Sequence, residues 1–482
     1  MKPSKATMLL TLLLGLSACL TPVREQELGD AQAREIERQV GLVRDPMLRG
    51  YVRAVGMRLA AASERPTSPW SFEIARSPEP NAFSLPGGHV YVTRGLLVLV
   101  NSEDELAGVL GHEIAHVTAR HSLKRLRAAL LTAPVSLASA VAGLAAGIVS
   151  PLLRDAVVGT GRVLTGGLVL APYSRAQERE ADAIGQALAA SAGYDPAGLP
   201  AFLHTLERDT HLRRADTARP HFLDGHPLTA ERIEESKARA KMLSPAPGAP
   251  IAATRAALYQ ILDGLLVGPD PAQGLFVGTL FVHPDLDLRI AFPAGWRTLN
   301  TPETAGAVSP DREALVALRL VAAGTSLDAV LEQSARADRS LVFERGTVHG
   351  LPAAWGRHTS GGQVADITLI AFRGDVLAVV GQCAASKIDA YGPVFARTAR
   401  SLRALLPEER RAIRVSRLRL RRAHAGETAA QVVARTGSSW SAAQLEVANA
   451  LEAGAQLAEG QPLKVALPAP YLPQAHEAPA RP

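Results

Sequence analysis

The chain has 482 residues, which is too many for one ordinary hydrophobic core, so we expect two or three domains. Hydrophobic residues make up 47% and charged residues 20% of the chain, a balance that is typical of globular proteins and excludes a mainly disordered one. The net charge of +6 is small for this length and predicts no nucleic-acid partner, and two cysteines exclude a disulfide framework.

The N-terminal residues have the pattern of a bacterial lipoprotein signal peptide. Lys2 and Lys5 give a positive start, Met8–Leu16 is apolar, and the sequence LSAC ends at Cys19. We predict a signal peptide over residues 1–19, cleavage before Cys19 and lipidation of that residue. Leu20 follows, which by analogy with enterobacterial sorting favours the outer membrane, facing the periplasm. In the alternative, a plain secretory signal, Cys19 is incidental.

Helical periodicity over 25–40 and a Pro at the start of 46–62 predict two helices before the first strands. The apolar runs 72–75 and 89–93 are typical of strands, and the Pro- and Gly-rich stretch between them predicts a tight connection. We therefore expect a small sheet early in the chain.

Gly111 to His116 reads GHEIAH and lies inside the helical run 106–126, whose apolar residues Val109, Leu110, Ile114 and Val117 beside the motif predict a core helix. Two histidines four residues apart lie on one face of a helix, so His112 and His116 can bind one metal ion. Glu113 beside them is the carboxylate expected to take a proton from a water at the metal. Ser102, with Glu three residues later, predicts a capping box where this helix begins.

Catalytic zinc usually takes three protein ligands, so a third must come from elsewhere in the chain. The best candidate is the charged helical run 173–182, where Glu178 and Asp182 share one face. We expect Glu178 to bind the metal and Asp182 to accept a hydrogen bond from a ligand histidine. Without the first motif, this run would be interpreted as an ordinary solvated helix.

Four segments together resemble the gluzincin peptidase family of HtpX and the CAAX-prenyl endopeptidases, in its periplasmic lipoprotein branch. The resemblance covers residues 25–242, and its segments are NAFSLPGG (81–88), GHEIAHVTARH (111–121), EREAD (178–182) and HPLTAER (226–232). It implies a mainly helical zinc-metallopeptidase domain with a small edge sheet and one Zn²⁺ per chain, held by His112, His116 and Glu178.

The resemblance also implies further site residues. His226 should lie close to the metal, where it either stabilises the oxyanion of the reaction or binds the zinc and masks it. A histidine that merely caps the next helix is the alternative. Arg232 should pair with an acid or with substrate, and His121 should support the site without binding metal. Asn81 and Ala82 should form a sheet edge that binds extended peptides.

The remaining chain carries no catalytic pattern. We predict a linker with a short helix over 243–273, a small α/β domain over 274–406 and a LysM-like module over 413–466, followed by a disordered tail over 467–482. A turn at 293–296 resembles PsbP-like domains. The uncharged run 128–153 is long enough to span a bilayer, but Pro134 and Pro151 interrupt it and its residues are only weakly hydrophobic. The family resemblance implies a buried or lid-forming helical hairpin here instead.

The sequence thus predicts an α+β protein that acts as a zinc endopeptidase of the periplasm, anchored to the outer membrane by lipid. The family resemblance implies envelope protein quality control, with misfolded or stalled envelope proteins as substrates. The alternative is a chaperone or assembly scaffold with a masked zinc site. A weaker alternative, a peptidoglycan hydrolase or binder, rests on the LysM-like residues alone.

Overall fold

The computed structural model describes residues 22–125, 172–213, 225–301, 304–338 and 340–472. Helices and strands are both abundant, so the α+β class predicted from the sequence is confirmed. The chain divides into two compact units, and the first is discontinuous in sequence. Unit 1 contains the peptidase-like residues up to Gly268 together with residues 416–469, and unit 2 is built around residues 269–415.

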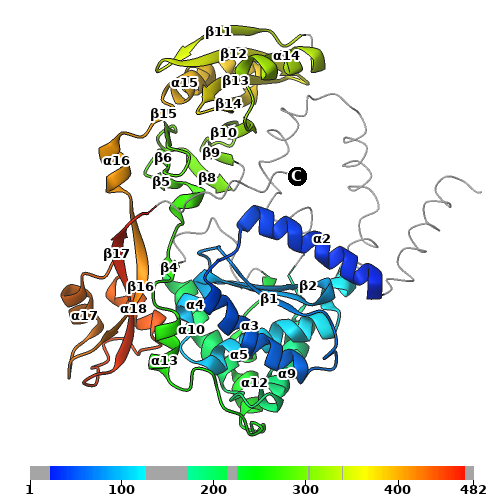
Figure 1. Cartoon of the computed structure of the whole chain (residues 1–482), viewed down its shortest axis with the longest axis vertical. Coiled ribbons are helices and arrows are strands. Elements are labelled where there is room, and N and C mark those ends of the chain that lie inside the picture. Colours follow the sequence, from blue (N-terminus) through cyan, green and yellow to red (C-terminus); the bar gives the residue numbers. More distant parts are fainter. Residues whose placement is uncertain (1–21, 126–171, 214–224, 302–303, 339, 473–482) are drawn as a thin grey trace, which may run out of the picture. The chain divides into compact units, whose positions relative to one another are not determined.

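Unit 1 is mainly helical (Figure 1), and it contains the predicted site residues. Its helices are α2 (Pro22–Val40), α3 (Pro46–Ala61), α4 (Arg94–Leu99), α5 (Glu103–Thr118), α9 (Arg175–Ser191), α10 (Gly198–Arg213), α12 (Ala230–Ala240), α13 (Arg255–Ile261), α17 (Ala429–Thr436) and α18 (Ala442–Ala448). Its strands are β1 (Ser71–Ala75), β2 (Ala82–Leu85), β3 (His89–Thr93), β4 (Leu266–Val267), β16 (Arg414–Arg422, from Ser416 on) and β17 (Pro462–Pro470, up to Ala469).

The small sheet predicted near the start of the chain has the order β1-β3-β2 and packs between helices. Side chains alternate along β3, as the two-residue repeat of a strand requires. Val90 and Val92 join the main core with α3 and α5, whereas Tyr91 packs against Ala33 and Ile36 of α2 on the other face. One face of the sheet therefore packs against α5, the helix that carries His112 and His116.

Helix α5 begins at the predicted cap but ends earlier than predicted. The Ser102 side chain accepts a hydrogen bond from the Glu105 amide, while the Glu105 carboxylate accepts from the Asn101 amide rather than completing the capping box. The helix stops at Thr118 because Arg120 adopts a left-handed conformation, with φ 53°. Residues 121–125 form a new helical turn.

Two glycines allow α5 and α9 to approach closely at the level of the site. A Cβ on Gly111 would lie 2.8 Å from the Gly185 carbonyl oxygen, and a Cβ on Gly185 would lie 2.7 Å from the His112 amide nitrogen. Neither position has room for a side chain. This close approach brings residues of α9 within reach of the histidines on α5.

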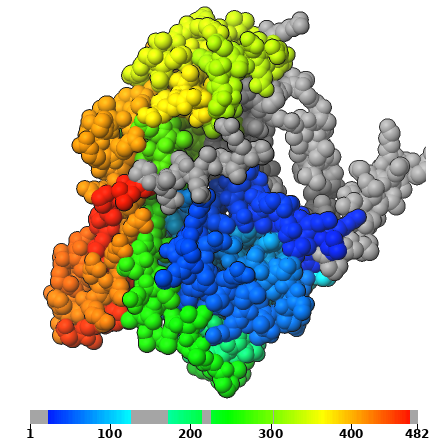
Figure 2. All heavy atoms as spheres, in the orientation of Figure 1, coloured from blue at the N-terminus to red at the C-terminus, as the bar shows by residue number. Residues whose placement is uncertain are grey.

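The C-terminal segment, residues 416–469, packs onto the peptidase-like helices as part of unit 1. Its strand β16 pairs with β4, through Ser416 with Val267 and Arg417 with Leu266, and the sheet order is β17-β16-β4. Apolar side chains from the segment, such as Leu463 and Val465, belong to the same core as α3, α4 and α5. Figure 2 shows its atoms, orange to red, directly against green atoms of the chain that precedes it in unit 1.

A buried lysine joins the segment to the rest of unit 1. Lys464 of β17 is fully buried, and its Nζ donates to the carbonyl oxygens of Val98 and Val100 at 2.8 and 2.7 Å. Arg94 of α4, also buried, donates to the carbonyls of Leu266 and Gly268, in and just after the strand with which β16 pairs. Burial raises the pKa of Glu105, in the first turn of α5, to about 7 and lowers the pKa of Lys464. The predicted separate module is thus packed into the unit that holds α5.

The predicted linker is an ordered part of unit 1 in the residues before β4. The backbone amides of Ile251 and Ala252 donate to the Glu103 carboxylate at 2.8 and 2.6 Å. The short helix predicted over 252–265 is α13, which is capped by Thr254.

Unit 2 contains a seven-stranded sheet of order β11-β12-β13-β14-β10-β9-β8 and a four-stranded sheet of order β15-β7-β6-β5. Helix α14 covers one face of the larger sheet and α15 the other, so Ile367 and Leu369 of β13 pack on one side while Ile370 and Phe372 pack on the other. Its elements are β5 (Leu275–Val277), β6 (Leu280–His283), β7 (Leu288–Ala291), β8 (Arg297–Thr301), β9 (Thr304–Val308), β10 (Ala314–Ala322), α14 (Leu327–Ala337), β11 (Phe343–Val348), β12 (Leu351–Ser360), β13 (Gln363–Phe372), β14 (Asp375–Ala384), α15 (Ile388–Arg400), β15 (Arg403–Ala404) and α16 (Pro407–Ala412).

Within the described residues, no helix is both long and apolar enough to cross a bilayer. Three predictions fall outside that part of the chain. They are the signal peptide with Cys19, the apolar run 128–153, and most of the tail after 472.

Candidate metal centre

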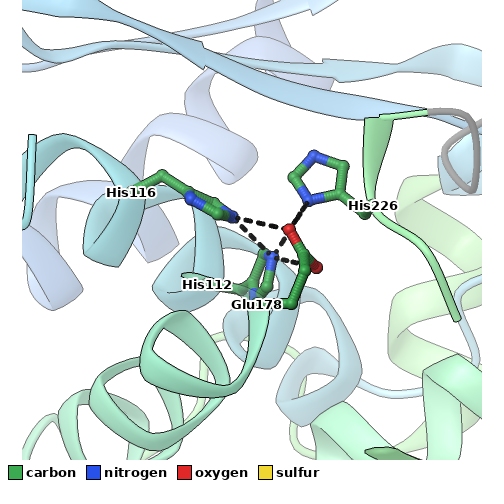
Figure 3. A group of neighbouring side chains, drawn as sticks. All are labelled: His112, His116, Glu178 and His226. Carbon is green, nitrogen blue, oxygen red and sulfur yellow. Dashed lines mark hydrogen bonds and ion pairs between the residues drawn. The ribbon is translucent and has the colours of Figure 1, made fainter. Parts of the chain in front are cut away.

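Four side chains converge in the middle of unit 1, and each is buried: His112, His116, Glu178 and His226. His112 and His116 come from α5, Glu178 from α9, and His226 from the short segment before α12, as Figure 3 shows. One potential ligand atom from each residue lies within 4.8 Å of those of the others. The two motifs that were far apart in sequence therefore meet in one cluster.

The contacts inside the cluster are those of donors arranged around one point. The Nε2 atoms of His112 and His116 lie 3.0 Å apart. A Glu178 carboxylate oxygen lies 3.4 Å from the His116 Nε2. His226 presents its Nδ1 to the same place, 3.2 Å from the His112 Nε2 and 3.0 Å from Glu178. His226 thus occupies the position of a fourth donor.

Two charged residues, Asp182 and Arg232, contact the side chains of the cluster and fix their positions. Asp182 lies one helical turn after Glu178, and its carboxylate is 2.9 Å from the His112 Nδ1. This contact fixes the ring so that its Nε2 faces the cluster. Arg232 binds Asp182 through Nε and Nη2, and its Nη1 lies 2.6 Å from Glu178. The Arg232 guanidinium is therefore committed to two carboxylates.

His116 has its own support. Its Nδ1 lies 2.8 Å from the Nδ1 of His121, whose other nitrogen contacts Glu180 at 3.1 Å. The break in the helix at Arg120 makes this contact possible, because it turns the chain so that His121 faces back toward His116. His121 lies next to the cluster and contributes no atom to it.

Glu113 is fully buried, and neither carboxylate oxygen has a hydrogen-bond partner among the described residues. The His226 Nε2 lies 3.5 Å from one of these oxygens. A buried carboxylate without a partner is costly, so such a group needs a ligand or a water to bind. Its position beside the cluster suits a base for a water molecule held there.

The electrostatics favour a cation in the cluster. Burial opposes ionisation of Glu178, but the charge on His226 and hydrogen bonds from His116 and His226 outweigh it and lower the Glu178 pKa. Burial, reinforced by the neighbouring imidazoles, holds the pKa of His116 well below its usual value. A metal ion requires these two states, an ionised carboxylate and a neutral imidazole.

The donor set fits zinc. Imidazole nitrogen and carboxylate oxygen in a buried four-donor group match the ligands that zinc takes in proteins, and hard cations such as Mg²⁺ prefer oxygen alone. The unpartnered Glu113 carboxylate beside the cluster is the second observation in favour of this fit. His112, His116 and Glu178 would hold the ion, and His226 lies beside them.

The predicted peptide-binding residues lie at one side of the small sheet. Ala82 begins β2, which pairs with β3 alone among the described strands, so its other edge lacks a strand partner there. Asn81 precedes it and is fixed by Thr93, whose side chain accepts from the Asn81 amide at 2.9 Å.

Two neighbours of the cluster did not emerge from the sequence as functional residues. The Tyr173 ring stacks on the His116 imidazole, with centroids 3.8 Å apart, and the Arg125 guanidinium lies 3.8 Å from the centroid of the same ring. The aromatic residue immediately before the cap of α9 was a usable signal for Tyr173. Arg125 gave no signal, because it lies in a basic run that is typical of a solvated surface.

The fold and the cluster define a metallopeptidase domain, and the comparison with protein families agrees: residues 46–240 match Peptidase family M48. The chain therefore contains a Peptidase M48 domain, and its cofactor is zinc.

Two groups of curated relatives share this domain. A putative beta-barrel assembly-enhancing protease of Vibrio cholerae is 33% identical over 49% of this chain and 49% of its own length. The beta-barrel assembly-enhancing protease of Escherichia coli is 30% identical over 46% of this chain and 45% of its own length. A mitochondrial metalloendopeptidase of Schizosaccharomyces pombe is 38% identical over 30% of this chain and 40% of its own length. The chain spans about half the length of the bacterial relatives it matches.

Proposed function

We propose that the protein is a zinc-dependent endopeptidase that hydrolyses peptide bonds of misfolded or stalled proteins of the bacterial envelope. The observation that carries this proposal is the buried cluster of His112, His116 and Glu178 with the unpartnered Glu113 carboxylate beside it. The printed names of the bacterial relatives, which refer to beta-barrel assembly, support the choice of substrate.

In the proposed mechanism, bound zinc supplies a Lewis acid that polarises the scissile carbonyl and acidifies the attacking water. Glu113 accepts the proton of that water and passes it to the leaving amine. Asp182 keeps the His112 ring in place, and Arg232 holds both Asp182 and Glu178. Since Arg232 is so engaged, His226 is the better candidate for stabilising the oxyanion.

The proposed location is the periplasm, with a lipid on Cys19 anchoring the protein to the outer membrane. The LSAC sequence supports this proposal, and the printed name of the Escherichia coli relative, which refers to beta-barrel assembly, is consistent with it. An extended segment of an unfolded substrate would add to the free edge of β2 near Asn81 and Ala82. Peptidoglycan binding by residues 413–466 stays a prediction.

The test is cleavage of casein and of an unfolded outer-membrane protein by the soluble form that starts at Leu20, with zinc measured in the same samples. We expect the wild type to cleave and Glu113→Gln to retain zinc while losing at least about a thousandfold in rate, since general-base catalysis and water positioning are both lost. His116→Ala should lose zinc and activity together. Undiminished cleavage by Glu113→Gln would rule out the proposed mechanism.

A second function is favoured by one observation, the position of His226 inside the cluster. If His226 completes the coordination of zinc, it excludes the water and leaves the protein as a masked enzyme or an assembly scaffold. His226→Ala then separates the two states. Cleavage that appears only in this variant indicates a masked peptidase, whereas zinc binding without cleavage in wild type and variant alike indicates a scaffold.

A further inference from the structure

Arg125 is a cation beside the metal centre that the proposed mechanism does not use. It lies on the helical turn 121–125, which follows the break after α5. Unlike Arg232, which is bound to two carboxylates, Arg125 has a buried Nε without a hydrogen-bond partner among the described residues. Its side chain remains partly exposed, so a ligand can reach it.

Arg125 is held in place by Tyr173. Its guanidinium carbon and the His116 ring centroid each lie 3.8 Å from the centroid of the Tyr173 ring. Two groups so close cannot share one face of the ring, so Tyr173 is sandwiched between them. The ring itself is fixed by the Ser122 hydroxyl, 3.0 Å from its own, and by its amide, which donates to the Gly225 carbonyl.

The sandwich sets how far Arg125 lies from His116. The His116 ring and the guanidinium each lie 3.8 Å from the Tyr173 centroid, on opposite faces, so roughly 7 to 8 Å separates them, which is the length of about two residues of an extended peptide. Arg125 is therefore too far to bind the scissile carbonyl. It is suitably placed for a group two residues away from the scissile bond.

The chemistry of that group follows from the charge. A guanidinium that is partly buried and has no acidic partner among the described residues is best satisfied by a carboxylate, which it binds through parallel hydrogen bonds. The negative charges of Glu178 and Glu113 attract the Arg125 guanidinium, but neither carboxylate forms an ion pair with it. The guanidinium can therefore bind the carboxylate of a ligand. A neutral or basic side chain would leave the charge without a counter-ion.

We propose that Arg125 is a specificity-determining residue that binds a carboxylate of the peptide substrate about two residues from the scissile bond. This proposal rests on the proposed peptidase function. Two sources can provide such a carboxylate, an Asp or Glu side chain or the free C-terminus of a chain.

The test uses fluorogenic peptides that differ only two residues from the scissile bond, with Asp, Asn or Lys there, and a further pair that ends near the bond as a free acid or an amide. We expect the zinc-loaded wild type to prefer Asp over Asn by roughly tenfold to a hundredfold in kcat/KM, as a charged hydrogen bond would give. In Arg125→Gln the Asp-to-Asn ratio should fall to about one. In Arg125→Glu the preference should be inverted, so that the Lys peptide is cleaved with a higher kcat/KM than the Asp peptide.

Lys124→Gln is the matched control, because Lys124 is the exposed neighbour on the same turn. It should keep the wild-type ratio. The proposal is overturned if both Arg125 variants keep the wild-type Asp-to-Asn and acid-to-amide ratios. An equal loss on all peptides overturns it too, because it would indicate a purely structural role. A preference for the acid of the acid–amide pair, without one for Asp, identifies a chain terminus as the ligand.

Equilibrium binding of the same peptides to the Glu113→Gln protein, measured by fluorescence anisotropy, separates this proposal from the peptidase function. Loss of Asp-selective binding on adding Arg125→Gln supports the role of Arg125 even if no peptide is cleaved by the wild type. Cleavage by the wild type without selectivity for Asp or for the free acid, in binding and in turnover, overturns the role of Arg125 alone.

Discussion

Residues 269–415 and the C-terminal segment both follow the peptidase-like residues in sequence, yet they relate to that domain in opposite ways. The first has its own two-faced core around α14 and α15. The second contributes Leu463, Val465 and the buried Lys464 to the core that also contains α5. The difference teaches that unit 2 is an insertion in the loop between β4 and β16, whereas the C-terminal segment is part of the catalytic unit.

Deleting the C-terminal segment should have the largest effect on folding and zinc binding, whereas removing residues 269–415 should have little. Deleting residues 416–482 exposes the apolar core of unit 1 and removes the partner of Val98 and Val100, so we expect no cooperative unfolding transition and no stable zinc binding. Replacing residues 269–415 by a short Gly-Ser turn should leave both intact, because Val267 and Ser416 are neighbours in an antiparallel pair, about 5 Å apart.

Calorimetry and zinc analysis check both variants. A well-folded, zinc-binding protein that lacks residues 416–482 would show that the C-terminal segment is dispensable, and the comparison would fail.

Zinc removal should separate the units next. Zinc binds only the folded cluster, so a free ion at 1,000 times its dissociation constant stabilises unit 1 by about 4 kcal/mol. We expect a chelator to lower the thermal transition of unit 1 and to leave that of unit 2 in place. His116→Ala is the matched control, since it should be insensitive to chelator. A parallel shift of both transitions would contradict the independence of the two cores.

Lys464→Met tests the joint itself. The substitution keeps the length of the side chain but leaves the carbonyls of Val98 and Val100 without a donor in a buried site, and it removes the cation near Glu105. We expect a loss of about 3–5 kcal/mol from unit 1. Urea titration measures it, with Lys241→Met, an exposed position, as a control that should stay within about 0.5 kcal/mol.

The smallest effects should come from two Arg-paired glutamates, one in each unit, whose contributions to stability depend on pH. Arg435 lowers the pKa of Glu427 in the C-terminal segment to about 2, and Arg403 with Arg289 lowers that of Glu409 in unit 2 to about 2. A lowered folded-state pKa stabilises the fold above the usual Glu value near 4.5, and this contribution disappears as the pH falls to about 2.

At neutral pH, Glu427→Gln should therefore cost unit 1 about 1–2 kcal/mol and Glu409→Gln should cost unit 2 a similar amount, allowing for solvent screening. Each variant should converge with the wild type near pH 2. If Glu409→Gln lowers the transition of unit 1 instead, the two units do not unfold separately.

The sequence predicted the parts of the site that depend on spacing along one helix. His112 and His116 are four residues apart, as are Glu178 and Asp182, and local geometry alone places each pair on one face. The start of α5 at Ser102 was predictable for the same reason. Strand β3 was predictable because its apolar residues are bounded by turn-forming ones.

What the sequence could not predict depends on contacts between distant residues. The end of α5 lies at a non-glycine residue, Arg120, whose positive φ is not favoured locally. The packing of Arg125 on Tyr173 brings together residues from either side of a long intervening run. The joining of the C-terminal segment to the peptidase core was equally hidden, because a lysine in a strand usually indicates solvent exposure.

The Lys464 contacts also have a consequence for the order in which the protein becomes active. Its partner Val98 lies 366 residues earlier in the chain, just before the helix that carries the zinc ligands. Closing a contact of such sequence separation is slow, and during synthesis or export it waits until residue 464 has emerged. A chain that stops before residue 464 lacks the two hydrogen bonds from Lys464 to the residues just before α5. We therefore expect proteolytic activity only from molecules whose synthesis has passed the C-terminal segment.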